Sequence, residues 1–370
     1  MIIFLRSYSI TKDSRLLKYI YLCKARGITY KVIGWDKDNT EYDSSEYIYF
    51  RSDFVIGGQW KNLFSILKWW YFIFSTIKEI ASHKKINTIH SVDLDCGMIG
   101  IITAKIIGAK HLYDIYDVFS ANRNMQGYIK NIVNAIERFI CRHSSYFIMP
   151  EKFRFKQLGI PCNDKKYNNF VEIENIPNIT LNNKIEQLSD INRIHLVYAG
   201  SLETKHRGIE NLLEAVSTNP DVSLDIAGIG PLTSLCESYA SKFSNIKFYG
   251  GISPQQVYEL ESKSTIIVGM YYKTRDNHFF ASPNKYYEHL ALGKVMLTTK
   301  GTPPGFKVEK YQTGFAIDET IEDIDNIIQY MRDNKDVLAQ YAKNARKVWL
   351  DSYKDYNAMY FAKQYTKMVG

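Results

Sequence analysis

Short apolar runs alternate with longer amphipathic stretches along the whole chain, and this alternation starts twice. Such alternation is typical of parallel sheets built from β–α–β units. The predicted strands cover residues 1–5, 29–34, 87–90, 111–116 and 145–150, then 194–200, 222–228, 245–250, 265–270 and 294–299. The predicted helices cover residues 13–26, 61–82, 96–107 and 129–143, then 208–217, 231–243, 254–262 and 283–292. Because the alternation restarts, two doubly wound α/β domains explain it better than one large sheet.

A polar stretch rich in asparagine divides the two halves. Residues 179–193 (ITLNNKIEQLSDINR) lack an apolar period, which is typical of a linker. We therefore predict an N-terminal Rossmann-like domain over residues 1–178 and a C-terminal one over residues 190–350. A last helix over residues 352–370 is expected to pack back on the N-terminal domain.

The composition is that of an ordinary globular protein. Of 370 residues, 45% are hydrophobic and 23% are charged, which excludes disordered, collagen-like and disulfide-scaffold classes. The five cysteines show no CxxC or Cys/His spacing, which favours free thiols in a reducing compartment over a zinc site. No apolar run reaches the ~18 residues that span a bilayer, and the first apolar run is too short for a signal peptide. We therefore expect a cytoplasmic protein, either soluble or peripheral on a membrane.

All of the excess positive charge lies in the first half of the chain. Residues 1–178 carry 25 Lys and Arg against 17 Asp and Glu, whereas the remaining residues carry 22 of each. A basic half favours an anionic partner, such as a nucleic acid, acidic lipid headgroups or a phosphorylated substrate. An ordinary lysine-rich surface explains the charge equally well. No RRM, KH or helix-turn-helix signature supports a nucleic-acid partner.

The segment 279–294 (FFASPNKYYEHLALGK) has the signals of a helix start. Ser282 is a preferred N-cap and Pro283 suits the first helical position, where its missing N–H costs nothing. A helix N-terminus offers unpaired N–H groups and partial positive charge, both of which suit a phosphate.

Three polar residues of this segment are candidates for binding a nucleotide. Asn284 and Lys285 fall in the first helical turn, where an ammonium group would assist an anion. Glu288 lies one turn after Asn284, and its carboxylate could accept hydrogen bonds from sugar or ribose hydroxyls. The alternative is a capped helix with a solvated polar face.

A second candidate phosphate cradle lies at residues 197–216 (VYAGSLETKHRGIENLLEAV). The predicted strand runs into Gly200, and a basic loop with Lys205 and Arg207 leads into the next helix. This layout suits a phosphate, although it is not the Walker GxxxxGK[ST] motif. In AGIGP, Gly228 follows the next strand and permits close backbone approach.

Taken in order, these segments resemble a family-4 glycosyltransferase of the two-Rossmann-domain GT-B architecture. The resemblance covers nearly the whole chain and is best over residues 194–317. VYAGSLETKHRG resembles the family's strand, glycine and basic loop that hold the donor diphosphate, and IAGIGP resembles its G-x-G-P turn. ASPNKYYEHLALGKVMLTT resembles the block SPNK-x-x-E-x-x-A-x-G-K-P-V, which is the most specific match. In the first half, IHSVDLDCGMIG resembles the family's H-x-H-D strand end.

The resemblance implies a donor site in the second half. Arg207 takes the position of a lysine that contacts the donor phosphates, and Lys205 could replace an arginine that is Ser201 here. Glu288 matches the second glutamate of the family's E-x7-E motif and is expected on the ribose, whereas the first falls at Phe280. The implied donor-binding residues are Gly200, Ser201, Gly228, Ser282, Asn284, Lys285 and Glu288.

The resemblance also implies the reaction. A sugar, of hexosyl type, moves from a nucleotide sugar to a glycan acceptor with retention of configuration, and the leaving diphosphate oxygen takes the acceptor proton. The implied catalytic residues are Arg207, Lys205, Asp93 and His90, with no metal and no cofactor. His90 and Asp93 match two positions of H-x-H-D, where the second histidine is Val92. We expect both on the acceptor side, and buried strand-end roles are the alternative.

Two aromatic-rich segments bear on the acceptor. Residues 64–80 (FSILKWWYFIFSTIKEI) and 151–166 (EKFRFKQLGIPCNDKK) mix aromatic and cationic side chains, as interfacial helices do. One interpretation is docking on the inner face of an anionic cell membrane, where a polyprenyl-diphosphate-linked acceptor would await the sugar. That role suits synthesis of a surface polysaccharide, such as a capsule or O-antigen. The other interpretation of residues 64–80 is a core helix.

Two further functions fit the same architecture. A nucleotide-sugar 2-epimerase would convert the donor without any acceptor. A non-catalytic nucleotide-sugar-binding module would explain Phe280 and Ser201 as marks of lost catalysis.

Overall fold

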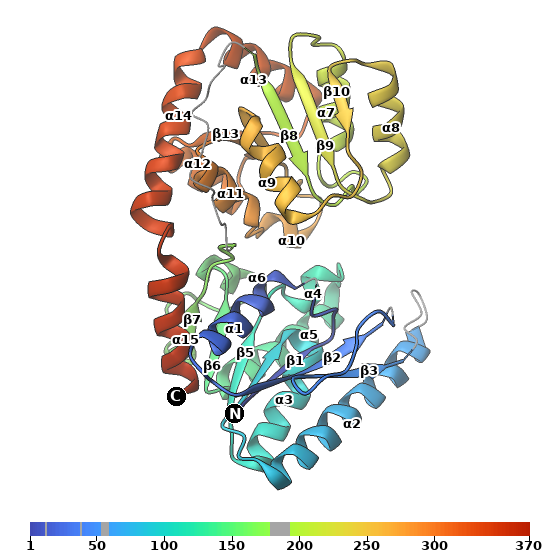
Figure 1. The fold of residues 1–370 in the computed structure, drawn as a ribbon, viewed down its shortest axis with the longest axis vertical. Helices are drawn as coiled ribbons and strands as arrows, with labels where there is room; N and C mark the ends of the chain where they lie inside the picture. The colour runs from blue at the N-terminus through green and yellow to red at the C-terminus, as the bar shows by residue number, and fades with distance from the viewer. Residues whose placement is uncertain (12, 38, 53–58, 178–192) are drawn as a thin grey trace. The chain divides into compact units, whose positions relative to one another are not determined.

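The structure is a computed structural model that describes residues 1–11, 13–37, 39–52, 59–177 and 193–370 (Figure 1). The chain divides into two units, of which the first comprises Met1–Asn175 and Ala358–Gly370 and the second Ile176–Asn357. Each unit has its own hydrophobic core around a parallel sheet.

The first unit holds a seven-stranded sheet in the order β3-β2-β1-β4-β5-β6-β7, and all of its strand pairs are parallel. Its strands are β1 (Ile2–Arg6), β2 (Tyr30–Asp36), β3 (Tyr47–Arg51), β4 (Thr88–Val92), β5 (Lys110–Asp114), β6 (Tyr146–Met149) and β7 (Phe170–Glu172). Its helices are α1 (Ser14–Ala25), α2 (Gln59–His83), α3 (Asp93–Ile107), α4 (Phe119–Asn122), α5 (Gly127–His143), α6 (Phe155–Leu158) and α15 (Ala362–Val369), with 3-10 turns at Lys152–Arg154 and Lys165–Tyr167.

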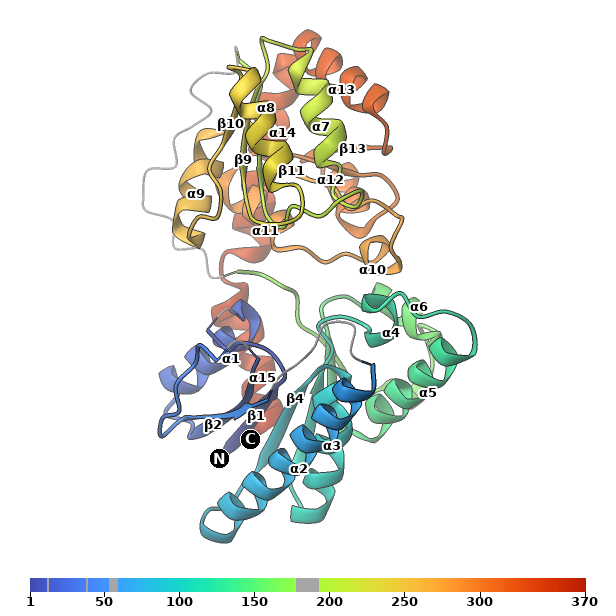
Figure 2. The same ribbon diagram turned by 90° about the vertical axis from the view of Figure 1, so that its right-hand side faces the viewer.

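The helices of the first unit form two groups. Helices α2 and α3 lie side by side, as do α3 and α5 (Figure 2). The C-terminal helix α15 packs beside α1 through rings, with the centroid of Tyr365 4.7 Å from that of Tyr19. Residues 358–370 therefore belong to the core of the first unit, although they are the last in the chain.

The second unit repeats the same strand order. Its six parallel strands run β10-β9-β8-β11-β12-β13, so the first strand is again central and the chain crosses over it to reach the fourth. Its strands are β8 (His195–Ala199), β9 (Ser223–Ala227), β10 (Ile246–Phe248), β11 (Ile266–Gly269), β12 (Val295–Thr299) and β13 (Gly314–Ile317). Its helices are α7 (Ile209–Ser217), α8 (Thr233–Lys242), α9 (Pro254–Lys263), α10 (Asp276–Phe279), α11 (Asn284–Leu292), α12 (Pro303–Tyr311), α13 (Ile321–Asp333) and α14 (Lys335–Val348).

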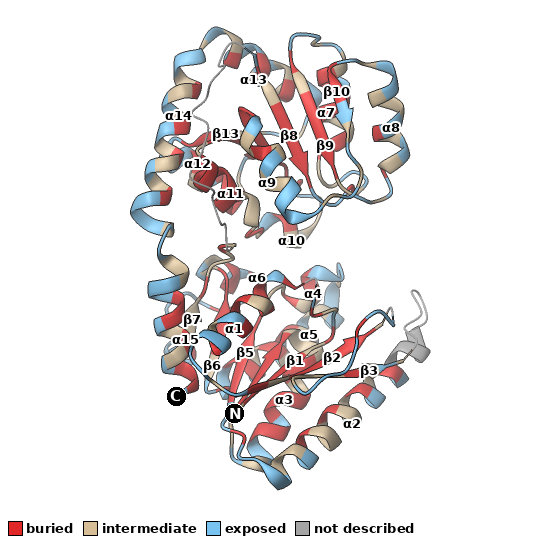
Figure 3. Ribbon diagram, viewed as in Figure 1, coloured by how far each residue is buried: buried red, intermediate tan, exposed pale blue. Residues whose placement is uncertain are grey.

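The predicted fold class is confirmed, and each predicted strand is present with small shifts at its ends. Three strands were not predicted: β3, β7 and β13. All three lie at the edges of their sheets, where a strand has one neighbour and its residues are only partly buried (Figure 3). β10 is also an edge strand and was predicted, so an edge position alone does not account for the three missed strands.

One predicted detail of the helices is wrong. Helix α11 begins at Asn284, and its N-cap is Pro283 in an extended conformation, so Ser282 lies one position too early to cap it. After α14, Trp349–Tyr353 form a π-helical turn, and turn residues 354–355 separate it from a second π-helical turn at Asn357–Phe361, close to the predicted start of the last helix at residue 352. Within the described residues, no helix combines the length and the apolar character that crossing a bilayer requires.

The loops after β8 and β9 approach each other so closely that glycine is required. Gly228 has a φ of +152°, and a Cβ there would overlap the carbonyl oxygen of Gly200. At Gly230 a Cβ would lie 2.6 Å from the carbonyl oxygen of Leu202. Backbone contact between these loops therefore fixes the carboxyl end of the second sheet.

We expect Gly228→Ala to lower the free energy of unfolding by about 3 kcal/mol, because the new methyl group strains the backbone and collides with the loop after β8. Gly301→Ala is the matched control, since Gly301 also has a positive φ of +77° but faces open space. The control should lose only about 1 kcal/mol, the cost of the left-handed conformation. Urea unfolding measures both values, and equal losses would contradict the close approach.

Candidate functional site

The carboxyl end of the second sheet brings together the loop after β8 and the start of α11. The Cε of Lys285 would lie 3.9 Å from a Cβ placed on Gly200, and its ammonium lies 5.7 Å from the ring centroid of Tyr198. Ligands bind at this end of the sheet in doubly wound folds. The two predicted phosphate-binding segments therefore meet in one unit.

Arg207 is held in this site by an aromatic ring and a carboxylate. Its guanidinium lies 5.0 Å from the ring centroid of Tyr271, directly after β11, and its Nη2 is 3.3 Å from Oε1 of Glu203. The other oxygen of Glu203 accepts a hydrogen bond from Nη1 of Arg275 at 3.1 Å. Burial disfavours the ionised form of Glu203, but the Arg207 guanidinium holds the pKa of that carboxyl below its usual value.

Lys205 lies in the same loop in a different setting. Its φ is +62°, its backbone N–H donates to Glu210 at 2.8 Å, and its side chain is exposed. Ser201 is also exposed, whereas Gly228 lies against the loop after β8. This loop thus presents one partly buried cation, Arg207, and one exposed cation, Lys205.

The first turns of α11 carry Lys285 and Glu288, and the sequence did not predict that Lys285 pairs with Glu261. The ammonium of Lys285 lies 3.3 Å from Oε1 of Glu261, a fully buried residue of α9. The Glu288 side chain is 9% exposed, and burial together with the charge of Glu261 raises its pKa to about 8. Asn284 is partly buried in the first turn, and Ser282 is buried.

Sequence reasoning missed Glu203, Tyr271, Arg275 and Glu261. Glu203 precedes Arg207 by four residues, so its role as a counter-charge could have been found from that spacing. Glu261 lies on another helix, and its sequence position carries no signal of the contact with Lys285.

The two predicted acceptor residues of the first unit lie in different surroundings. His90 is 0% exposed, its Nδ1 lies 2.9 Å from the hydroxyl of Tyr365, and its ring packs on Tyr19 and Phe4. The imidazole is therefore a core residue beneath α1 and α15. From this position it cannot touch an acceptor, which favours the structural alternative for His90.

Asp93 instead lies at the carboxyl end of the first sheet. Asp93 is the first residue of α3 and has a φ of +59°. This value is uncommon in residues other than glycine and indicates a functional or tightly constrained position. Its Oδ2 accepts a hydrogen bond from Nη1 of Arg6 at 2.6 Å, and its Oδ1 accepts one from the backbone N–H of Tyr116 at 3.0 Å. Nε of Arg6 also lies 2.6 Å from Oδ2 of Asp13, so one cation and two carboxylates lie together at the carboxyl end of the first sheet.

The two aromatic-rich segments differ in exposure. In α2, Trp69, Ile73 and Ile77 are fully buried, as expected of a core helix, while Phe64, Leu67 and Tyr71 are exposed on the opposite side. In residues 151–166, Arg154 and Phe155 are buried, and Arg154 donates to the carbonyl oxygen of Tyr116. In the second segment, Arg154 and Phe155 therefore contact the protein interior and are not available to a membrane.

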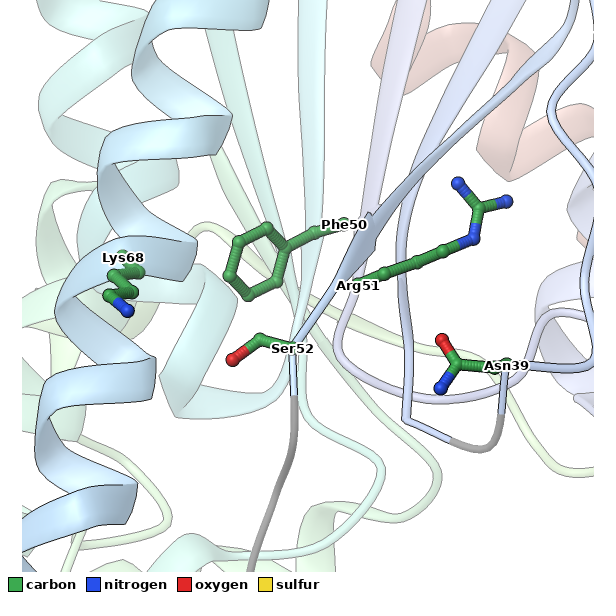
Figure 4. Close-up of a pocket in the computed structure, with 5 residues that line it drawn as sticks. All are labelled: Asn39, Phe50, Arg51, Ser52 and Lys68. Carbon is green, nitrogen blue, oxygen red and sulfur yellow. The ribbon is translucent and has the colours of Figure 1, made fainter.

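A pocket of about 370 Å³ lies elsewhere in the first unit (Figure 4). It is lined by Asn39, Phe50, Arg51, Ser52 and Lys68. The Phe50 ring points toward α2, which carries Lys68, and the Arg51 side chain points the other way. None of the predicted site residues lines it.

Comparison with known proteins agrees with this geometry. Residues 182–348 match the family described as "Glycosyl transferases group 1". No match is found among curated protein sequences. This match covers less than half of the chain, and the predicted enzyme class, a glycosyltransferase, is confirmed.

Several solved structures share the fold of the whole chain. HepE of Anabaena in complex with UDP has 15% identity and a TM-score of 0.71, with 99% of each chain covered. Sucrose-phosphate synthase of Thermosynechococcus elongatus has 14% identity and a TM-score of 0.72, with 99% of this chain and 98% of that chain covered. The lipopolysaccharide outer core galactosyltransferase WaaB has 13% identity and a TM-score of 0.64, with 98% and 99% covered. At these identities the likeness establishes the GT-B fold.

The pKa of Asp93 gives the first unit a testable pH dependence. Burial raises this pKa from 3.8 to about 6 against the opposing effect of Arg6. Between these two pH values the folded protein retains a proton that the unfolded chain has released. The free energy of unfolding that this proton contributes is lost as the pH rises through about 6.

We expect Asp93→Asn to flatten the fall of unfolding free energy between pH 4 and 6, because asparagine tolerates the left-handed conformation and does not titrate. Urea unfolding across this range measures the slope. Glu79→Gln, an exposed change on α2, is the control and should keep the wild-type slope. A wild-type slope in Asp93→Asn would mean that this carboxyl does not hold the proton.

Proposed function

We propose that this glycosyltransferase moves a hexosyl group from a nucleotide sugar to a glycan acceptor, with retention of configuration and without a metal, as a family-4 enzyme does. The main support for the proposal is that the loop with Arg207 and the start of α11 lie at the same end of the second sheet. There Arg207 packs on the ring of Tyr271, and Lys285 lies near the ring of Tyr198. The second unit would bind the donor, and the charged edge of the first unit around Asp93 would face the acceptor.

The donor diphosphate would be bound by side-chain cations and by a helix end. The planar guanidinium of Arg207 can grip two phosphate oxygens once it leaves Glu203, and Lys205 adds an exposed ammonium. The start of α11, a helix of nine residues without a side-chain cap, lies at the same end of the sheet and would present its first N–H groups. Together they would stabilise the negative charge that develops on the leaving diphosphate.

Retention is what the resemblance to a family-4 glycosyltransferase implies. When the leaving diphosphate oxygen takes the proton of the acceptor hydroxyl on the same face, no side-chain base is required. The protein then contributes orientation and charge stabilisation. Glu288 would accept hydrogen bonds from the ribose hydroxyls. Uridine is the first nucleotide to test, because HepE is solved with UDP and with UDP-glucose.

We expect Arg207→Ala to lower kcat/KM for the donor by about 10- to 100-fold, with kcat reduced and the donor KM raised, because a charged contact to the leaving group is lost. A thermal-shift screen against UDP-, GDP-, ADP- and dTDP-sugars first selects the donor, since a bound ligand raises the Tm. Transfer is then measured as release of the nucleoside diphosphate.

Lys242→Ala, an exposed change at the end of α8, is the control and should leave kcat/KM unchanged. Conversion of the donor without an acceptor would indicate the 2-epimerase instead. Donor binding without turnover across a panel of acceptors would indicate a binding module. Unchanged kinetics in Arg207→Ala would contradict the assigned donor site.

The acceptor is proposed to be a glycan on a lipid diphosphate at the cytoplasmic face of a membrane, in surface polysaccharide synthesis. The exposed residues Phe64, Leu67 and Tyr71 recur on one side of α2, next to Lys68. Further apolar side chains are exposed on the neighbouring helices, namely Ile102, Ile106, Ile129, Ile132 and Phe139. This apolar surface belongs to the half of the chain with the excess positive charge, which suits an anionic interface.

We expect the protein to co-sediment with vesicles of equal parts phosphatidylglycerol and phosphatidylcholine, and less so as salt is raised. Replacing Phe64, Leu67 and Tyr71 together by serine should weaken binding by about 10-fold or more, because their apolar area no longer enters the interface. Tyr330→Ser, an exposed change in the second unit, is the control. Equal binding to neutral vesicles, or none, would contradict membrane docking.

A further inference from the structure

We propose that Glu261, Lys285 and Glu288 form a triad that shares one proton, and that nucleotide binding releases this proton. Within it Glu261 is a positioning residue, because it acts on the donor through Lys285 and Glu288. The link to the nucleotide rests on the proposed function, in which Glu288 binds the ribose.

The geometry places two carboxylates and one ammonium in a single buried cluster. Lys285 and Glu288 are three residues apart on α11 and thus share a face, and Oε1 of Glu261 lies 3.3 Å from the Lys285 ammonium. Glu261 is 0% exposed, and its Oε2 is buried without a hydrogen-bond partner among the described residues. A buried carboxylate oxygen without a donor is costly, unless a proton or a ligand group satisfies it.

The charges around the cluster do not balance without a proton. The ionisable groups that face it from other positions are Tyr258 on α9, Tyr198 on β8 and Tyr271 after β11. Burial raises the pKa of each of these tyrosines well above its usual value, so they stay neutral. Arg207 faces Tyr198 and Tyr271 but is paired with Glu203. Two carboxylates therefore share one ammonium, and one bound proton makes the triad neutral.

The proton and the nucleotide compete for the same carboxylate. Among the described residues, no donor bonds to the Glu288 carboxylate, so its oxygens are open to a ligand. Ribose hydroxyls donate hydrogen bonds, and they bind an ionised carboxylate better than a protonated one. When they bind Glu288, its proton leaves to solvent, while Glu261 keeps Lys285 in place beside the diphosphate.

The first test needs no ligand. Glu288 has a folded-state pKa of about 8 against its ordinary 4.5, so stability from this group is lost as the pH rises toward 8. Glu261→Gln leaves one carboxylate and one ammonium, which balance without a proton. We expect the slope of unfolding free energy against pH near pH 7 to report about one bound proton fewer than in the wild type.

Two further variants make this test decisive. Glu288→Gln should lose the same proton, and it carries the test if Glu261→Gln does not fold. Glu259→Gln, an exposed change on the same helix α9, should keep the wild-type slope. A wild-type slope in both Glu261→Gln and Glu288→Gln overturns the triad, because a structural role alone would change stability without changing its pH dependence.

The second test is calorimetric titration with UDP in two buffers of different ionisation enthalpy at pH 7. We expect about one proton released per UDP in the wild type and none in Glu261→Gln. Binding without proton release overturns the coupling. If UDP does not bind at all, the uridine donor of the proposed function is wrong and the coupling falls with it, while the stability slope still decides the triad.

Discussion

The need to pair every buried charge governs the candidate site. Guanidinium and ammonium groups lose hydration when they are buried, and this loss is recovered only beside a carboxylate or another acceptor. At the carboxyl end of the second sheet, Glu203 meets both Arg207 and Arg275, and Glu261 meets Lys285. Arg207 and Lys285 are thus already paired with carboxylates of the protein itself, whereas Lys205 is exposed.

This pairing determines how an anionic ligand can bind. In the proposed function a diphosphate would compete with Glu203 for Nη2 of Arg207, so binding there would exchange one anion for another. Such an exchange would moderate affinity, which suits a nucleotide that leaves after each turnover. At Lys285 the counter-charge is fully buried and cannot leave, so the compensating change there falls on the proton of Glu288. The carboxyl end of the second sheet therefore has two charges that could change when a ligand binds. One is the pairing of Arg207 with Glu203, and the other is the proton of Glu288.

The sequence predicts the part of this arrangement that depends on local pattern. Central strands are predicted because both of their faces are buried, whereas three of the four edge strands, β3, β7 and β13, are missed. Arg207 and Glu288 are predicted as site residues because they lie in recognisable motifs. Glu261 is missed because its partner is 24 residues away on another helix. A contact of that kind depends on packing between elements, which periodicity does not encode.

The strand β4 shows why neighbouring positions of one motif can differ in burial and in the residues that they contact. Successive side chains of a strand point to opposite faces, so His90 enters the core beneath α1 and α15, while Ser91 bonds to His111 at 3.0 Å on the other face. Asp93 follows the strand in a left-handed conformation, and its carboxylate accepts a hydrogen bond from Arg6 at the carboxyl end of the sheet. A motif such as H-x-H-D therefore fixes which residues are near the strand end. The alternation and the turn decide which of them can meet a substrate, and here the geometry favours Asp93 over His90.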